Sequence, residues 1–217
     1  MTSQSPMPIA ENVDQPARIA GAIVSIGSIV QLIAAFLPTA IVFDRNADPL
    51  VRLQAIASNT TGWMLQAFLF PIAFLIVAVG FGILSKAFPD SRTRNMAVAA
   101  TAFSVLSLLL WLPISLGRIQ LAADIQNVIR LYEPNSSLGI SFTTFLPYTL
   151  ATLLMIALMG VALFWSRLRR VTGASAIALA FLGLSALVVT GDWPPFLSYF
   201  FTLIMGIGLV VTRKQTS

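Results

Sequence analysis

The sequence contains no cysteine and no histidine, and only 10% of its 217 residues are charged. A soluble globular domain carries roughly 25% charged residues. Because 57% of this chain is hydrophobic, its composition excludes an ordinary water-soluble domain. Without cysteine or histidine the chain has no disulfides, thiolate nucleophiles, Cys/His zinc sites or imidazole acid–base catalysts. We therefore expect no catalytic residue, no metal site and no cofactor.

Charged residues are also missing from six long apolar stretches. Each stretch is close to the ~20 residues that an α-helix needs to cross about 30 Å of hydrocarbon. The stretches comprise residues 19–43, 63–85, 96–117, 142–165, 174–190 and 194–212. The sequence therefore predicts an all-α fold, a polytopic membrane bundle with six transmembrane helices. Residues 18–217 form its single domain, and residues 1–17, which are polar and contain three prolines, are expected to be a flexible cytoplasmic tail.

Lysine and arginine divide unequally between the two sides of this topology. Nine lie on the side of both termini, namely Arg18, Lys86, Arg92, Arg94, Arg167, Arg169, Arg170, Arg213 and Lys214, and four lie on the other, namely Arg45, Arg52, Arg118 and Arg130. Because positive charge favours the cytoplasmic side, both termini are predicted to be cytoplasmic, in the cell (inner) membrane. Attraction to anionic lipid headgroups then explains the net charge of +5 without nucleic acid.

Two predicted helix pairs share a series of short motifs. Each pair has a Leu-Pro that ends its first span, then a branched-Arg-Leu triplet, then an asparagine followed by two hydroxyl residues, and a proline twelve residues after that asparagine. The matching positions are Leu37-Pro38 and Leu112-Pro113, Arg52 and Arg130, Asn59 and Asn135, and Pro71 and Pro147. This pattern predicts that helix pair 1–2 is a parallel duplicate of pair 3–4. The alternative to duplication is chance recurrence of short motifs. The asparagines are expected to cap the helices that follow, and the alternative is that the same triplets are glycosylation sequons.

The longest connections, residues 44–62 and 118–141, lie on the predicted outer side. In the second, residues Ile125, Val128, Ile129 and Tyr132 share one helical face, which predicts an amphipathic segment on the membrane interface or over the mouth of the bundle. Arg52 and Arg130 are candidates to contact an anionic headgroup or a carboxylate. The alternative is that each is a solvated or lipid-facing cation.

Polar residues inside the spans gather near the prolines on the predicted outer side. Bends at Pro71 and Pro147 are expected to splay the bundle and open a cavity. Its candidate lining residues are Gln66, Pro71, Thr143, Thr144, Pro147, Tyr148, Thr149 and Thr152. The alternative is that proline and threonine are ordinary components of transmembrane helices. Trp63 and Trp111 are interpreted as part of an aromatic belt at the outer membrane boundary.

The segment Ala17-Arg18-Ile19-Ala20-Gly21 places an arginine just before a helix that begins with small residues. This start resembles a family of uncharacterised bacterial integral membrane proteins with about six predicted helices. The resemblance implies a location in a bacterial inner membrane, and it brings no catalytic residues with it.

The spans lack the ionisable residue that ion-coupled transporters usually keep within the membrane. We therefore expect a non-enzymatic multi-pass protein that acts through interaction, as an accessory subunit of a membrane complex or a binder of a lipid or small molecule. Its expected partners are the bilayer and other membrane-protein subunits. The alternative is a facilitator or substrate-binding component of a transporter with an outward-facing cavity. A surface enzyme that uses the predicted outer carboxylates is a third hypothesis, and its candidates are Asp44, Asp48, Asp124 and Glu133.

Overall fold

The computed structural model describes residues 9–43, 47–131, 142–190 and 195–211, and within these ranges all regular structure is helical. The elements are α1 (Ile9–Phe36), the 3-10 helix η1 (Ala40–Phe43), α2 (Pro49–Ser58), α3 (Thr60–Ser85), α4 (Ser91–Ala123), α5 (Ile125–Arg130), α6 (Phe142–Trp165), α7 (Arg170–Thr190) and α8 (Pro195–Val210). The predicted all-α fold is therefore confirmed.

Five helices, α1, α3, α4, α6 and α7, are long and apolar enough to cross a membrane. Their exposed faces are apolar too, as Ile72, Leu75 and Val79 of α3 illustrate, since each is about half exposed. Helix α8 is equally apolar, but its 16 residues extend only about 24 Å at 1.5 Å per residue. The length and composition of these helices identify a multi-pass membrane protein.

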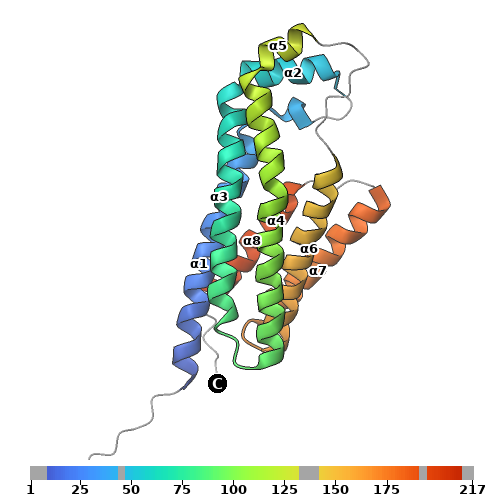
Figure 1. The fold of residues 1–217 in the computed structure, drawn as a ribbon. Coiled ribbons are helices and arrows are strands. Elements are labelled where there is room, and N and C mark those ends of the chain that lie inside the picture. Colours follow the sequence, from blue (N-terminus) through green and yellow to red (C-terminus); the bar gives the residue numbers. More distant parts are fainter. Residues whose placement is uncertain (1–8, 44–46, 132–141, 191–194, 212–217) are drawn as a thin grey trace, which may run out of the picture.

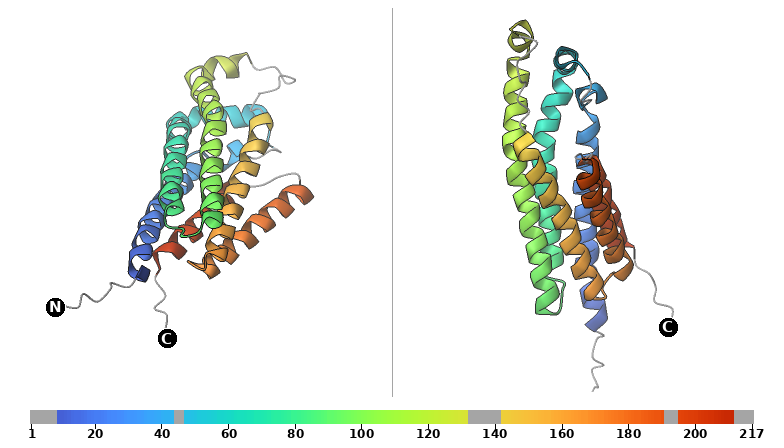
Figure 2. Two further views of the ribbon diagram at one scale, coloured as in Figure 1. Left: turned by 60° about the horizontal axis from the view of Figure 1, so that its bottom comes forward. Right: turned by 90° about the vertical axis from the view of Figure 1, so that its right-hand side faces the viewer.

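The long helices form a ring in which each contacts its neighbours, in the order α1, α3, α4, α6, α7 and α8, and α8 closes the ring onto α1. In Figure 1, α3 and α4 stand side by side, with α6 and α7 beyond α4. Figure 2 shows α3 and α4 on one side of the bundle and α7 and α8 on the other. Helices α2 and α5 contact each other across one end of the bundle, which we call the capped end.

Apolar side chains hold the cap onto the bundle. Leu53 and Ile56 of α2 and Ile125 of α5 are buried in one cluster with Trp63 at the start of α3 and Ala122 at the end of α4. The amphipathic segment expected in the second long connection thus includes α5. Its buried face packs on α2 and on the ends of the long helices.

Asn59 joins the end of α1 to the beginning of α3. Its Oδ1 accepts a hydrogen bond from the backbone N–H of Gly62 at 3.1 Å, and its Nδ2 donates to the carbonyl of Leu37 at 2.9 Å. Asn59 is therefore an N-cap, as the sequence predicted. The matching Asn135 lies outside the described residues.

A second cap sets the turn between α3 and α4 at the other end of the bundle. The hydroxyl of Thr93 hydrogen-bonds to the carboxylate of Asp90, which also accepts from the Thr93 backbone N–H at 2.8 Å. These bonds stabilise the charged form, so they lower the pKa of Asp90 from its ordinary value. Arg94 donates through Nε and Nη2 to the carbonyl of Phe88, at 3.2 and 3.0 Å.

Helix α1 differs from its predicted span at both ends. It begins at Ile9, within the segment expected to be a flexible tail, and Pro16 lies inside it. It ends at Phe36 and not at residue 43, because Pro38 cannot donate the backbone hydrogen bond that would continue the helix. Residues Ala40–Phe43 instead form the separate turn η1, which contacts α2.

Helix α4 corrects the prediction that Leu112-Pro113 ends the third span. It continues through Pro113 to Ala123, so residues 118–123 belong to a helix and not to a connection. An interior proline removes a single backbone hydrogen bond and costs about 3 kcal/mol. Here Ser115 and Ala122 continue the buried face of α4 beyond the proline, so tertiary packing outweighs that cost.

Small residues let α1 and α8 approach closely within the chain. A Cβ built on Gly21 would lie 2.7 Å from the carbonyl oxygen of Gly206, and one on Gly206 would lie 2.5 Å from Ser25 Oγ. Gly21 and Ser25 of α1 therefore serve packing inside the bundle, where close contact replaces the missing hydrophobic drive between helices in lipid.

Candidate functional site

Aromatic side chains from four helices meet in the interior next to the cap. We call this set the aromatic layer, and it consists of Phe70 and Phe74 from α3, Trp111 from α4, Tyr148 from α6 and Tyr199 from α8. The ring centroid of Trp111 lies 4.7 Å from that of Phe70 and 4.8 Å from that of Tyr148. All five side chains are buried, so the layer packs together helices that are far apart in the sequence.

Polar groups of the aromatic layer hydrogen-bond across the ring of helices. The hydroxyls of Tyr148 and Tyr199 lie 2.8 Å apart and link α6 to α8. One turn further along α6, Thr152 donates to the Tyr148 carbonyl at 3.0 Å and lies 3.2 Å from the hydroxyl of Ser107 on α4. The polar face of α6 is therefore directed into the bundle and not toward lipid.

Arg118 lies between the aromatic layer and the cap. Its guanidinium carbon is 4.6 Å from the ring centroid of Trp63 and 5.4 Å from that of Trp111. The indole N–H of Trp63 donates to the Arg118 carbonyl at 3.1 Å. Cation–π contacts stabilise by about 2 kcal/mol where the cation is desolvated. The half-buried side chain of Arg118 thus extends from α4 to α3, and its charge lies beside aromatic rings of both helices.

The sequence interpretation of this region was wrong in two respects. Arg118 was assigned to a connection, whereas it lies within α4. Trp63 and Trp111 were assigned to a belt at the membrane boundary, whereas they are only 1% and 2% exposed. Helical spacing contains the signal that was missed: Trp111, Ser115 and Arg118 follow Ser107 at intervals of four, four and three residues, which places them on one face of a helix.

Two hydrogen-bond donors beside Arg118 are buried without a partner in the part of the chain that the structure describes. They are Trp111 Nε1 and Ser115 Oγ. An indole N–H can only donate, and leaving such a group unsatisfied costs about 1–3 kcal/mol. The face of α4 that leads to the cap therefore presents two unused donors next to a guanidinium.

Four of the predicted cavity residues are buried in this part of the bundle. Gln66 Nε2 donates to the carbonyl of Ala34 at 3.0 Å, and among the described residues its Oε1 has no hydrogen-bond partner. Tyr148, Thr149 and Thr152 are each at most 2% exposed on α6. The structure thus brings the polar side chains of α6 close to the aromatic layer.

The other four predicted cavity residues are Pro71, Thr143, Thr144 and Pro147. Helices α3 and α6 continue through Pro71 and Pro147, of which the first is half-buried and the second exposed. The side chains of Thr143 and Thr144 lie outside the described part of the structure. The outer cavity itself stays a prediction.

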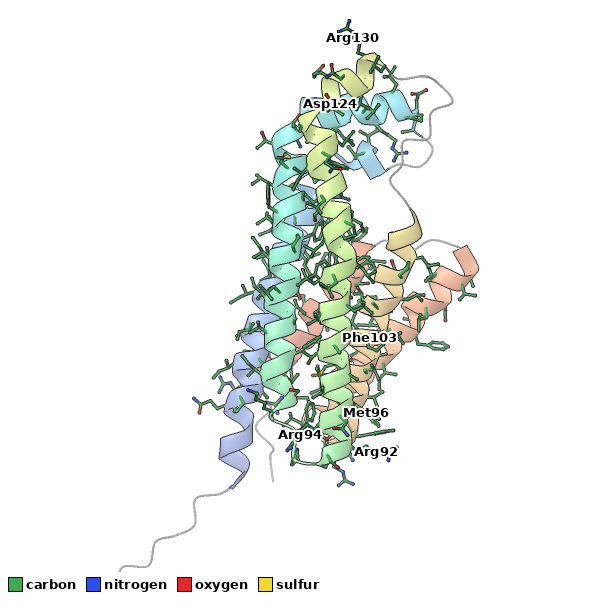
Figure 3. The ribbon with its side chains drawn as sticks, in the orientation of Figure 1. Arg92, Arg94, Met96, Phe103, Asp124 and Arg130 are labelled. Carbon is green, nitrogen blue, oxygen red and sulfur yellow. The ribbon has the colours of Figure 1, made fainter. Side chains whose placement is uncertain are left out.

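Arg52 and Arg130 occupy neighbouring helices of the cap with different surroundings. Arg52 Nε donates to the carbonyl of Val42 at 3.2 Å, which ties α2 to η1. Arg130 is exposed at the far end of α5, where Figure 3 shows its side chain directed away from the bundle. Their joint contact with an anion stays a prediction.

The described carboxylates of the cap serve local structure. Asp48 accepts from the backbone N–H of Leu50 at 2.7 Å and caps α2, while Asp124 accepts from the side-chain amide of Asn127 at 2.6 Å. Asp44 and Glu133 lie outside the described residues. No group of three or more metal-binding side chains is found in the ranges that the structure describes.

Comparison with protein-family models, with curated proteins and with solved structures finds no match to this chain.

Proposed function

We propose that this chain is a non-enzymatic, multi-pass protein of a bacterial inner membrane that acts through interaction. It binds a lipid or small molecule near its capped end, alone or as an accessory subunit of a membrane complex. The observation that carries the proposal is the combination of Arg118 with the buried, unused donors of Trp111 and Ser115. Polar and ionisable groups are costly within membrane helices and are usually retained for function.

The proposal includes six transmembrane helices, with α8 as the sixth, and an internal duplication. Two features of the fold support the duplication. In each proposed copy a short helix lies between two long ones, α2 between α1 and α3, and α5 between α4 and α6. Both short helices lie at the capped end and contact each other.

We also propose that the capped end faces outward and that both termini are cytoplasmic. Positive side chains at the opposite end support this orientation, including Arg92 and Arg94 at the start of α4, which Figure 3 shows. Single cysteines at Pro89 and Gln126, both exposed, provide a clean test because the natural chain has no cysteine. A membrane-impermeant maleimide added to intact cells should label Q126C and not P89C. The reverse labelling pattern would contradict the orientation.

Binding is tested by isolating the full chain from its native membrane in a mild detergent. We expect mass spectrometry of the purified protein to find a lipid, a small molecule or a partner subunit in a fixed ratio to the chain. Loss of every such component on gentle purification, or reproducible turnover of a substrate by the isolated chain, would contradict the proposal.

The alternative function is a facilitator or substrate-binding component of a transporter. It is favoured by the polar groups of Gln66, Tyr148, Thr149 and Thr152, which gather inside the helix ring. The same preparation distinguishes the two functions after reconstitution into liposomes. A facilitator moves the retained ligand across the bilayer, whereas a binding protein retains it without flux.

A further inference from the structure

The face of α4 near the cap combines three kinds of hydrogen-bond donor. Trp111 contributes an indole N–H, Ser115 a hydroxyl and Arg118 a guanidinium. They are spaced at four and three residues, so they lie one above the other along the helix. Trp111 and Ser115 are only 2% and 4% exposed, and neither donor has a partner in the described ranges.

Within the described residues, the two buried donors of this face, Trp111 Nε1 and Ser115 Oγ, have no acceptor. Hydrogen bonds from a guanidinium or from N–H and O–H groups are strongest to carboxylate and phosphate oxygens. Arg118 is half-buried whereas the two donors below it are buried. An oxyanion placed beside Arg118 would therefore meet donors that are buried away from water.

The beginning of α6 adds a favourable field at the same level. Tyr148 packs on Trp111, and α6 starts at Phe142, six residues or about 9 Å before Tyr148 along the helix axis. Arg118 lies seven residues, about 10 Å, beyond Trp111 toward the cap. The N-terminus of α6 is therefore close to the height of Arg118, and the positive end of a helix dipole favours an anion there.

We infer that Trp111, Ser115 and Arg118 form a binding site for an oxyanion at the capped end of the bundle. The oxyanion is the phosphate of a lipid headgroup or the carboxylate or phosphate of a free small molecule. This inference rests on the proposed binding function and specifies its ligand class. Figure 1 shows where α4 passes α6 below the cap.

The test uses the purified full chain in a neutral detergent. It is titrated with short-chain phosphatidylglycerol, with phosphatidylcholine of the same chain length, and with inorganic phosphate and decanoate. Bound lipid is counted by native mass spectrometry, and tryptophan fluorescence follows all four ligands because Trp63 and Trp111 flank Arg118. We expect saturable binding of an anionic ligand. Preference for phosphatidylglycerol identifies a headgroup, whereas equal or tighter binding of phosphate or decanoate identifies a free anion.

Three variants test the donors, and R130Q is the matched control because Arg130 is an exposed arginine at the same end. A hydrogen bond to a charged group contributes about tenfold or more in affinity. We expect R118Q to weaken anion binding by at least that factor, W111F and S115A to weaken it severalfold, and R130Q to leave it unchanged.

Thermal stability separates ligand binding from packing. Because the Ser115 hydroxyl is buried without a partner in the described ranges, S115A should melt at the same or a higher temperature than the natural chain while it binds the anion more weakly. Undiminished anion binding by S115A, W111F and R118Q would overturn the inference, and so would the absence of saturable binding of phosphatidylglycerol, phosphate and decanoate alike. If the chain then still retains a neutral ligand or a partner subunit, the proposed function stands without this site.

Discussion

Replacement of Gly206 by leucine should destabilise the chain by about 3 kcal/mol or more, because overpacking at this close contact forces the backbones of α8 and α1 apart. A Cβ at this position would lie 2.9 Å from the backbone nitrogen of Ser25 and 3.0 Å from the carbonyl oxygen of Gly21. Both are backbone atoms, so no change of side-chain rotamer relieves the collision. The leucine must separate α8 from α1, and that contact closes the ring of helices.

Gly117→Leu is the matched control for Gly206→Leu. Gly117 also lies in a helix, but a Cβ there meets nothing within 4 Å. The melting midpoint of each purified variant is measured by heating in detergent, followed by size-exclusion chromatography with fluorescence detection. We expect the midpoint of G206L to fall by several degrees or more and that of G117L to stay near the natural value. Equal midpoints would show that the α1–α8 contact is looser than described.

Replacement of Trp111 by alanine should destabilise the chain by about 4 kcal/mol, the usual loss when a large buried aromatic side chain is removed. Trp111 is 2% exposed and contacts Phe70, Phe74 and Tyr148 within the aromatic layer. Its ring also faces the guanidinium of Arg118. The alanine variant leaves a void between α3, α4 and α6 that these neighbours cannot fill without moving.

Trp165→Ala isolates the effect of burial. Trp165 also has an arginine over its ring, with Arg92 at 4.3 Å, but it is 47% exposed. An exposed cation–π contact contributes about 0.5–1 kcal/mol, so W165A should melt only slightly below the natural chain. A midpoint for W111A as high as that of W165A would mean that Trp111 contributes depth anchoring and little packing.

Apolar runs without charge predict helices well because lipid cannot form hydrogen bonds with the backbone. In lipid, every backbone polar group must be satisfied within the protein, and a helix does this within a single segment. The predicted span 142–165 coincides with α6, and the predicted span 63–85 ends where α3 ends. Asn59 also predicts the start of α3, because an asparagine side chain accepts a hydrogen bond from one of the first backbone N–H groups of a helix, which have no partner within the helix.

The same reasoning failed where packing decided the outcome. Proline predicts a helix end because it lacks an N–H, and α1 does stop before Pro38. Helix α4 nevertheless continues through Pro113, because the residues beyond it find a buried surface on α3 and the cap. The first charged residue after an apolar run is also taken, from local sequence alone, to predict the end of a helix. For that reason the sequence predicts Arg118 in a connection, although it lies within α4.

The sequence by itself determined that this protein is helical and embedded in lipid, since apolar runs without charge have few other stable forms in a membrane. It also determined several helix ends, which depend on groups within a few residues. The tertiary structure alone decided which face of each helix is buried, and hence that Trp63, Trp111 and Arg118 meet between α3 and α4. In a chain whose helices are apolar on nearly all sides, hydropathy cannot orient a helix about its axis. Close packing against specific neighbours does so instead.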